Sequence, residues 1–251
     1  MDSNRNLSSV SASRARIAAP QVLEQASPWV PPLAFREQPA TIRVLPVRRP
    51  GWLSLCAKRA LDIVGALAGL ALCAIAYVMC ARRTRRETGG SVIFRQQRVG
   101  ERGRVFTVYK LRTMMADAEA RLHELMPYNE MKGHIFKIRE DPRVTRLGQF
   151  LRRYHIDELP QFWNVLRGEM SLVGARPPTV DEAAKYERHH WRRLDMKPGL
   201  TGLWQVSGNG SVYDFEQVVE MDRWYVDNWS LLLDLKILVK TVWALPGGRG
   251  W

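Results

Sequence analysis

The stretch IVGALAGLALCAIAYVMCA, residues 63–81, decides the fold, because its nineteen residues carry no charge. A helix needs roughly 20 apolar residues to cross the hydrocarbon of a bilayer. The length alone therefore favours a single membrane span. Gly65 and Gly69 have the G-x-x-x-G spacing that can bring another helix close, although apolar stretches often contain this spacing by chance.

Basic residues border this stretch on both sides: Lys58 and Arg59 precede it, and Arg82, Arg83, Arg85 and Arg86 follow it. Positive flanks favour the cytoplasmic side of a membrane, so two such flanks conflict with a simple crossing. A helix that enters the bilayer, bends and returns on the same face satisfies both ends. The sequence therefore leaves a single span and a re-entrant helix as alternatives.

The chain divides into three parts around this helix. Residues 1–50 are rich in Ser, Ala, Pro and Arg without periodicity, which predicts a disordered leader. Residues 51–90 hold the membrane helix with its basic flanks, and residues 91–251 form the third part. No basic-then-apolar secretory signal begins the chain, so the third part is expected to stay in the cytoplasm.

The third part is predicted to be mainly helical with one small β-hairpin. Two β-prone stretches, 91–99 and 104–111, flank a glycine-containing turn. Helices are predicted at 116–125, 144–154, 157–166, 179–194, 214–228 and 231–245. The last two are rich in Trp, Tyr and Leu, which fits either a buried core or amphipathic helices in the membrane interface. The expected fold class is α+β, mainly helical and membrane-embedded.

Charge and cysteine content narrow the partners and the compartment. The formal net charge of +13 indicates anionic partners, which include phosphate groups, acidic lipid and nucleic acid. Cys56, Cys73 and Cys80 form no C-x-x-C pair and no even-numbered framework. They are therefore interpreted as small core residues in a reducing compartment.

Two adjacent carboxylates, Asp157 and Glu158, begin a predicted helix with Pro160 in its first turn. At such a place a carboxylate usually caps the helix N-terminus, so capping is the ordinary alternative. Arg152 lies just upstream, and anionic phosphates need guanidinium or ammonium partners. One carboxylate can act as a covalent nucleophile while a second holds a divalent metal. The combination predicts phosphoryl-transfer chemistry at this pair.

Two further segments carry candidate phosphate-binding cations. Lys110 and Arg112 lie on one face of a predicted strand because side chains alternate at period two, and a bound anion would relieve their repulsion. Arg176 precedes Pro177 and Pro178 in a loop that contains glycine, which would present one guanidinium rigidly. A solvated strand face and an ordinary connector between helices are the respective alternatives.

Taken in order, these segments resemble the bacterial sugar transferase family, the polyprenyl-phosphate hexose-1-phosphate transferases. The matching motifs are KRALD (58–62), VIFRQ (92–96), YKLRTM (109–114), DELPQ (157–161), NVLRG (164–168), MSLVG (170–174), KPGLTG (197–202) and YVDNW (225–229). The resemblance covers about residues 57–245. It implies the minimal, monotopic form of the family, without the extra transmembrane helices and further domain of larger members.

The resemblance implies a reaction and a set of roles. Asp157 would attack the phosphorus bonded to the sugar of a UDP-sugar, releasing UMP and forming an aspartyl-phosphosugar. Polyprenyl (undecaprenyl) phosphate would then take the sugar-phosphate, and Glu158 would ligate Mg²⁺. The expected location is the cytoplasmic face of the bacterial inner membrane, at the first membrane step of exopolysaccharide, capsule or O-antigen synthesis. Phosphate binding would fall to Arg152 and Arg176, and donor binding to Lys110, Arg112 and Asp222.

The sequence departs from the family pattern at three places. Cys73 and Ala74 stand where the re-entrant helix normally bends at a Ser-Pro pair, so a known cause of kinks is missing. Ala175 replaces the proline that usually precedes the arginine at 176, which would make that loop less stiff. Asn209 stands where many relatives have an arginine, which puts one donor contact in doubt.

Two other classes of function compete with this interpretation. A nucleic-acid-binding module would explain the basic charge, but it needs no uncharged helix and the chain carries no recognisable binding motif. A catalytically inactive membrane scaffold of the same fold would not need Asp157 and Glu158. The Trp-rich segment 225–235 is similar to members that use UDP-glucose or UDP-galactose. A homo-oligomer is possible, and the sequence contains no feature that decides it.

Overall fold

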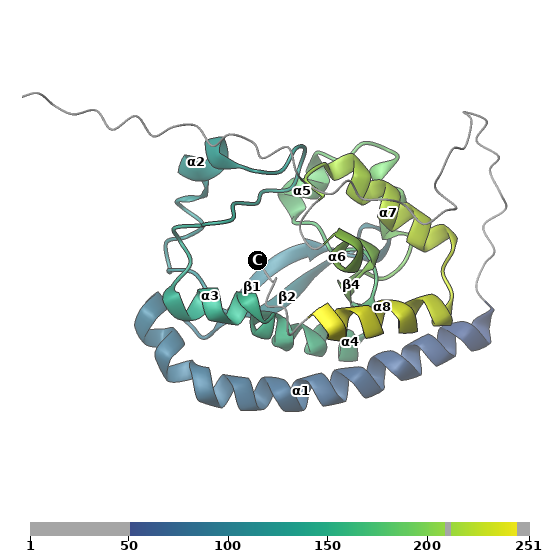
Figure 1. Cartoon of the computed structure of the whole chain (residues 1–251), viewed down its shortest axis with the longest axis horizontal. Helices are drawn as coiled ribbons and strands as arrows, with labels where there is room; N and C mark the ends of the chain where they lie inside the picture. Colours follow the sequence, from purple (N-terminus) through teal and green to yellow (C-terminus); the bar gives the residue numbers. More distant parts are fainter. Residues whose placement is uncertain (1–50, 209–211, 245–251) are drawn as a thin grey trace, which may run out of the picture.

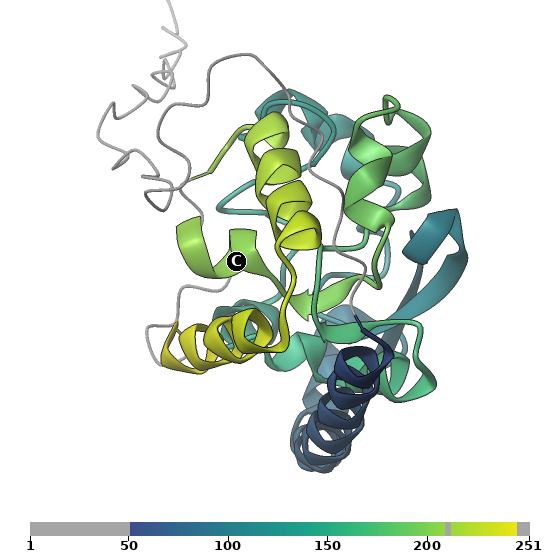
Figure 2. The ribbon, with the colours of Figure 1, turned by 90° about the vertical axis from the view of Figure 1, so that its right-hand side faces the viewer.

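The computed structural model of the chain describes residues 51–208 and 212–244, so the predicted leader lies outside the described part. Its longest element is α1, Trp52–Thr88, a continuous helix of 37 residues. At 1.5 Å per residue α1 is about 55 Å long. Figure 1 shows α1 curving gently along the base of the molecule, beneath α3 (Arg146–Arg153), α4 (Phe162–Arg167) and α8 (Leu231–Ala244). Figure 2 shows that the body of the molecule lies on one side of α1.

The helix α1 is long and apolar enough to cross a membrane, and most of its apolar stretch is exposed. It continues through Cys73 and Ala74 without a break in the helical backbone. The sharp bend of the family is therefore not found at this place, in agreement with the missing proline. A gentle curve around the body replaces it (Figure 1).

Two glycines let α1 approach the rest of the chain closely. A Cβ on Gly65 would lie 2.6 Å from a methyl carbon of Leu172, and one on Gly69 would clash with three ring carbons of Phe162. Phe162 begins α4, and Leu172 belongs to β3, Ser171–Val173. The G-x-x-x-G spacing thus does bring a second element close, and its partners belong to the same chain.

Buried polar contacts fasten the N-terminal half of α1 to the body. Lys58 Nζ lies 2.6 Å from Asp234 Oδ2 on α8, and both side chains are buried. Asp62 Oδ1 accepts hydrogen bonds from Ser171 Oγ at 2.9 Å and from the Leu172 backbone N–H at 2.8 Å. Charged groups on an otherwise apolar helix are costly unless paired, so these contacts determine which face of α1 meets the body.

The C-terminal end of α1 is also fastened to the body. Glu87 Oε2 accepts the Leu147 backbone N–H at 2.9 Å, at the start of α3. The Thr88 carbonyl oxygen accepts the Ala116 N–H at 3.0 Å. Gly89 then ends the helix in the left-handed conformation, with φ of 67°. Both ends of α1 therefore contact the same folded unit.

The predicted hairpin is confirmed. Strands β1 (Ile93–Val99) and β2 (Val105–Leu111) pair antiparallel from Ile93 opposite Leu111 to Val99 opposite Val105. A short 3-10 turn, η2 (Glu101–Gly103), closes the hairpin, with Arg102 at φ 54° and Gly103 at φ 79°. The glycine-containing turn predicted from the sequence supplies this positive φ.

A second pair of strands was not predicted. β3 and β4 (Gly199–Thr201) lie parallel, with Ser171 opposite Gly199 and Val173 opposite Thr201. No strand was predicted at either segment. Three residues are too few to display the alternation by which strands are recognised, and only the pairing of distant segments defines them.

The helices agree with prediction in part. Segment 116–125 is mostly turns and ends in α2 (Leu122–Leu125), followed by η3 (Met126–Tyr128). Segment 157–166 begins as a 3-10 helix, η4 (Ile156–Gln161), and continues as α4, which Gly168 ends in the left-handed conformation at φ 79°. Segment 179–194 breaks into α5 (Val180–Ala184) and η5 (His190–Leu194). The helix α6 (Leu203–Gly208) was not predicted.

The last two helices have different environments. α7 (Phe215–Asp227) buries six of its residues, including Val218, Met221 and Tyr225, and is a core helix. α8 buries Asp234 and Ile237 but exposes a row of apolar side chains along its other face. The two alternatives for this region therefore divide between the helices: α7 has the buried position, and α8 has the exposed apolar face that a membrane interface requires.

Candidate active site

The two adjacent carboxylates lie on η4, between α3 and α4 and above the middle of α1 (Figure 1). His155 precedes η4 in the left-handed conformation, with φ of 55°, and makes no side-chain capping bond. Such a conformation is uncommon outside glycine and turns the chain sharply between α3 and η4. Asp157 is buried, whereas Glu158 is half-buried.

Lys110 contacts Glu158 directly. Its Nζ lies 2.7 Å from Glu158 Oε1, so Glu158 is paired with strand β2 and is not turned toward the backbone of its own helix. Burial by itself raises the pKa of Glu158, but the charge and hydrogen bond of Lys110, together with His155 and Arg176, lower that pKa to about 2. Glu158 is therefore ionised at neutral pH. The capping alternative does not describe this side chain.

The pKa of Asp157 moves in the opposite direction. Burial raises it, the nearby cations Lys110 and Arg152 lower it, the negative charge of Glu158 raises it, and the net change is upward. Two adjacent carboxyl groups thus have pKa values that differ widely. Such a separation is typical of sites in which one acid reacts while its neighbour remains a fixed charge.

Arg152 is held beside this pair by a residue that the sequence analysis did not single out. Its Nε donates to Thr113 Oγ1 at 3.0 Å, and Thr113 is buried two residues beyond β2. The pKa of Arg152 is lowered by burial, against the opposing charges of Asp157 and Asp141. Arg152 therefore lies among carboxylates, in a position to neutralise an anion that approaches Asp157.

Arg176 lies in the loop between β3 and α5 and is about one-third exposed. Its Nη1 is 4.0 Å from Glu182 Oε1, and its charge is one of those that lower the pKa of Glu158. The structure thus brings Lys110, Arg152 and Arg176 around the two carboxylates from β2, α3 and the β3–α5 loop.

Two predicted donor-site residues have other partners. Arg112 Nε donates to the Ser91 carbonyl oxygen at 2.9 Å, and the guanidinium lies 5.5 Å from the centre of the Phe94 ring. Arg112 is therefore hydrogen-bonded to the segment just before β1, whereas Lys110 is paired with Glu158. Asp222 is buried on α7 and receives the Nε–H of Arg193 at 2.9 Å. A donor-binding role for either residue stays a prediction.

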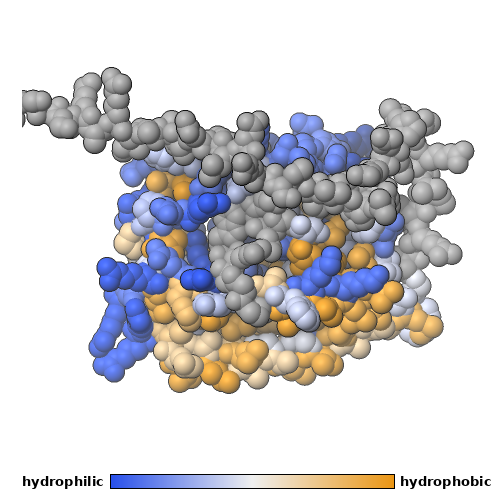
Figure 3. Space-filling model, viewed as in Figure 1, coloured by the Kyte–Doolittle hydropathy of each residue, from blue (hydrophilic) through white to orange (hydrophobic). Residues whose placement is uncertain are grey.

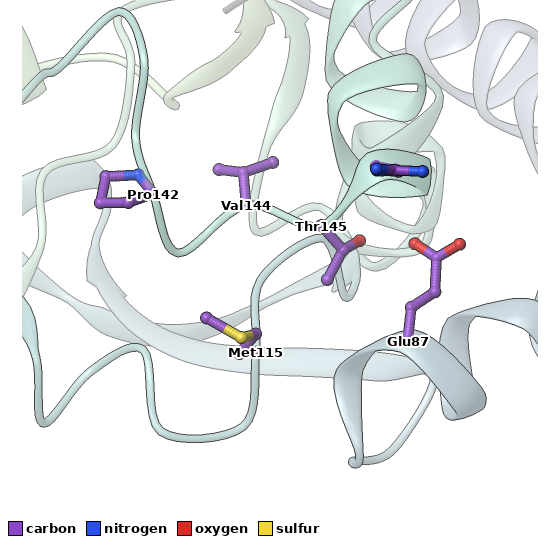
Figure 4. Close-up of a pocket in the computed structure, with 6 residues that line it drawn as sticks. Glu87, Met115, Pro142, Val144 and Thr145 are labelled. Atoms are coloured by element: carbon purple, nitrogen blue, oxygen red, sulfur yellow. The ribbon is translucent and has the colours of Figure 1, made fainter.

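A cavity of about 400 Å³ opens between the end of α1 and the start of α3 (Figure 4). Its lining consists of Glu87, Met115, Pro142, Val144, Thr145 and Arg146. Neither Asp157 nor Glu158 lines this cavity, so the candidate site rests on the charges and contacts of these two acids and not on the cavity.

A histidine cluster lies elsewhere, on η5 and α7. His189 Nε2 and His190 Nε2 lie 3.0 and 2.7 Å from the carboxylate oxygens of Glu216, a spacing at which a metal ion is possible. However, His190 Nδ1 accepts the Glu187 backbone N–H at 2.9 Å. The Nε2 of a neutral His190 therefore carries the proton and donates it to Glu216. A metal-binding histidine instead donates through its other nitrogen, so the cluster is a hydrogen-bonded link between η5 and α7.

The sequence of the chain is similar to those of known proteins. The family described as "Bacterial sugar transferase" matches residues 53–247. The chain is 49% identical over 196 residues to a galactosyl transferase, CpsE, of Streptococcus agalactiae, which covers 78% of this chain and 43% of that protein. It is 42% identical over 188 residues to an undecaprenyl-phosphate galactose phosphotransferase of Salmonella typhimurium, covering 73% and 39%. It is 40% identical over 199 residues to the exopolysaccharide production protein ExoY of Rhizobium meliloti, covering 77% and 87%. The chain thus spans about two-fifths of the first two proteins and most of the third.

Proposed function

The chain belongs to the bacterial sugar transferase family, and from this premise we propose that it transfers a hexose-1-phosphate from a UDP-sugar to polyprenyl phosphate. UMP is the second product, and the transfer begins the synthesis of a surface polysaccharide. The observation that carries the proposal is the buried Asp157 beside the ionised Glu158, with three cations around them. The names of two relatives, an undecaprenyl-phosphate galactose phosphotransferase and a UDP-galactose-lipid carrier transferase, support the donor and acceptor classes.

In the first step, a carboxylate oxygen of Asp157 attacks the phosphorus that carries the sugar. A new oxygen–phosphorus bond forms, the bond to the leaving UMP breaks, and the sugar-phosphate remains on Asp157 as an acyl phosphate. In the second step, a phosphate oxygen of the lipid attacks the same phosphorus, and the bond to Asp157 breaks. The carboxylate is thereby regenerated, so the chain is unchanged after one turnover.

The raised pKa of Asp157 favours this role in one respect. A more basic carboxylate is a better nucleophile once it is ionised, and the nearby cations Lys110 and Arg152 favour the ionised form. Arg152 and Arg176 neutralise the phosphate oxygens, whose charge would otherwise repel Asp157. Lys110, held at Glu158, supplies a third positive charge in the same place.

A divalent metal fits the residues present. Glu158 is ionised and offers a hard carboxylate oxygen, and Mg²⁺ in proteins commonly takes one or two carboxylates together with substrate phosphates. When bound, Mg²⁺ would supply charge neutralisation for the diphosphate of the donor. Because Lys110 contacts Glu158 Oε1, binding of the metal requires Lys110 to move or the other carboxylate oxygen to be used.

The apolar face of the molecule supports a position in the membrane. Figure 3 shows hydrophobic residues along the base of the molecule, with hydrophilic side chains gathered at the end of α1 nearest α3. The exposed apolar side chains of α1 and α8 are Trp52, Leu53, Leu55, Val64, Leu67, Leu72, Ile75, Val78 and Met79, and Leu232, Leu235, Val239, Val242 and Trp243. A continuous apolar surface of this size is costly in water and favourable in a bilayer.

We further propose that α1 does not cross the bilayer. Its N-terminal half is tied to α8 through Lys58, and its C-terminal end to α3 through Glu87. Both ends therefore lie on the side of the folded body, and the basic flanks favour the cytoplasmic face for that side. A full crossing would separate one end from its buried partners by the thickness of the hydrocarbon, about 30 Å.

Labelling of the two ends tests this topology. Single cysteines at Leu53 and at Arg82, in a chain whose three native cysteines are replaced, would be treated with a membrane-impermeant maleimide. Inside-out vesicles should be labelled at both positions, and intact spheroplasts at neither. Labelling of one position from outside the cell would establish a span.

A donor assay tests the reaction. The purified chain would be incubated with Mg²⁺ and a panel of UDP-sugars without lipid, and UMP release and a mass increase on the peptide containing Asp157 would be measured. We expect UDP-galactose or UDP-glucose to give both signals. Asp157→Asn should lower the rate of UMP release by roughly 10³-fold or more. Asp195→Asn, at an exposed position, is the control and should leave that rate unchanged. A folded wild-type chain that releases no UMP from any donor would support the scaffold alternative.

A further inference from the structure

The loop that carries Arg176 is fixed by hydrogen bonds to four consecutive carbonyl oxygens. The donors are Gly199 N to Ala175 O at 2.9 Å, Arg193 Nη2 to Arg176 O at 3.4 Å, Arg98 Nη1 to Pro177 O at 3.0 Å, and Val99 N to Pro178 O at 2.9 Å. These donors belong to β4, η5 and β1. The loop is therefore held from three elements, and the alanine that replaces the family's proline at 175 does not leave its backbone without support.

Arg98 supplies one of these four hydrogen bonds from a buried side chain. It is a buried arginine on β1, 8% exposed, and its Nη1 donates to the Pro177 carbonyl oxygen. Its Nε and Nη2 both donate to Gln96 Oε1, at 3.1 and 2.7 Å. Burial, and then the positive charge of Arg176, lower the pKa of Arg98 to about 10, so it remains charged at neutral pH. A buried charge of this kind requires an anionic partner.

Glu182 is the anion shared by the two arginines. Its Oε2 lies 3.7 Å from Arg98 Nη1, and its Oε1 lies 4.0 Å from Arg176 Nη1. Glu182 is itself held by a capping box at the start of α5, where it accepts the Thr179 N–H at 2.8 Å and its own N–H donates to Thr179 Oγ1 at 3.0 Å. The carboxylate therefore has a fixed position between two guanidinium groups.

We propose that Arg98 and Glu182 are positioning residues that hold the Arg176 guanidinium in place for the donor phosphates. Arg98 fixes the backbone beside Arg176, and Glu182 fixes the direction of its side chain. The proposal rests on the proposed function, because it takes Arg176 as a ligand of the diphosphate. Neither residue is expected to touch the substrate.

The direction of the effect follows from the charges. Without the negative charge of Glu182, Arg98 and Arg176 repel each other across a buried gap, and Arg98 cannot leave because it is held by Gln96 and the Pro177 carbonyl. Arg176 is about one-third exposed and is free to swing toward water. Loss of Glu182 should therefore weaken diphosphate binding, although it also removes a negative charge from the neighbourhood.

A double-mutant cycle tests the proposal on the full chain purified in detergent. The dissociation constant of UDP would be measured for wild type, Glu182→Gln, Arg176→Gln and the double variant. Glutamine keeps an oxygen for the capping box, so the fold is retained. We expect Glu182→Gln to weaken UDP binding about tenfold in the wild-type background and less than twofold when Arg176 is already glutamine. Asp181→Asn, an exposed neighbour on α5, is the matched control and should have no effect.

A second variant examines the backbone contact. Arg98→Lys keeps the charge but loses the planar fork that reaches both Gln96 and Pro177, so it should weaken UDP binding in wild type and not in Arg176→Gln. A merely structural role would weaken binding equally in both backgrounds, which would overturn the proposal. Tighter UDP binding in Glu182→Gln would also overturn it, because Glu182 would then compete with phosphate for Arg176.

The same data separate this proposal from the proposed function. If Arg176→Gln weakens UDP binding and slows UMP release while Glu182→Gln and Arg98→Lys change neither, the transferase stands and the positioning roles fail. If Arg176→Gln binds UDP as wild type does and still releases UMP from the donor, the transferase again stands, and both Arg176 as a phosphate ligand and its positioning residues are excluded. If the wild-type chain neither binds UDP nor releases UMP, both proposals fail together.

Discussion

Breaking the buried ion pair between Lys58 and Asp234 should destabilise the protein far more than breaking an exposed pair of nearly the same length. Lys58 Nζ lies 2.6 Å from Asp234 Oδ2, and the two side chains are 9% and 1% exposed. Asp234 also accepts the Tyr225 hydroxyl at 2.7 Å and the Trp229 indole N–H at 3.1 Å. In Lys58→Met the carboxylate keeps these two neutral donors but loses the Lys58 cation, so a buried charge remains without its ion-pair partner.

The expected cost of Lys58→Met is about 3–5 kcal/mol, the range for removing one partner of a buried pair. For a folded unit of this size, that corresponds to a fall in Tm of roughly 6–20 °C. Arg192→Gln breaks a pair of 2.7 Å with Asp227, whose side chains are 35% and 37% exposed, and should cost less than about 1 kcal/mol. The two pairs differ in burial and hardly in distance, so burial accounts for the difference in the expected loss of stability.

Thermal unfolding in detergent, followed by tryptophan fluorescence, would measure both variants. The double variant Lys58→Met/Asp234→Asn carries neither charge, so it should be more stable than the sum of the two single changes predicts, by about 1–3 kcal/mol. If Lys58→Met lowers the Tm no more than Arg192→Gln does, the ion pair does not fasten α1 to the body. The position of α1 would then depend on the contacts of Asp62 and Glu87.

Three further predictions concern the reacting acid, the helix contact and the membrane. Burial raises the pKa of the Asp157 carboxyl in the folded state, so the stability from this group is present below its unfolded pKa of about 3.9 and is lost as the pH rises through its folded pKa. Asp157→Asn should therefore raise the Tm more at pH 7.5 than at pH 4. An equal change in Tm at both pH values would contradict the raised pKa of Asp157. Gly69→Leu places carbon against the ring of Phe162, where it clashes, and should cost about 1–3 kcal/mol in thermal unfolding, whereas Gly51→Ala, which meets no atom within 4 Å, should cost nothing measurable. Washing native membranes with 1 M NaCl should leave the chain bound, since its attachment is through apolar surface; release into the supernatant would favour electrostatic binding to nucleic acid or to lipid headgroups.

Features that depend on neighbours along the chain could be predicted from the sequence. The uncharged stretch 63–81 lies within α1, the hairpin turn falls at its glycines, and Gly168 ends α4 at positive φ. Each of these follows from local charge, periodicity or conformational preference. The prediction of a single helix at 179–194 was wrong, because polar periodicity along the chain gives no signal of the turns at 185–189 that separate α5 from η5.

The candidate site was predictable as a list of residues and not as an arrangement. Asp157, Glu158 and Arg152 share one segment, so their proximity follows from the sequence. The contact of Lys110 with Glu158 joins residues 48 positions apart, and no local rule predicts it. Thr113, the residue that holds Arg152, was missed because a single threonine after a strand has no distinguishing pattern.

The sequence predicts which groups are present: an apolar helix with basic ends, a pair of adjacent acids and several cations. The family resemblance predicts a role for each of these groups. Only the tertiary structure decided which cation neutralises which acid, that β3 and β4 pair, and that Glu182 lies between Arg98 and Arg176. The physical reason is that charges and backbone groups far apart in the chain acquire energies only when folding removes water between them. The ion pair between Lys58 and Asp234, which lie 176 residues apart in the sequence, is of this kind, and it joins the apolar helix α1 to α8.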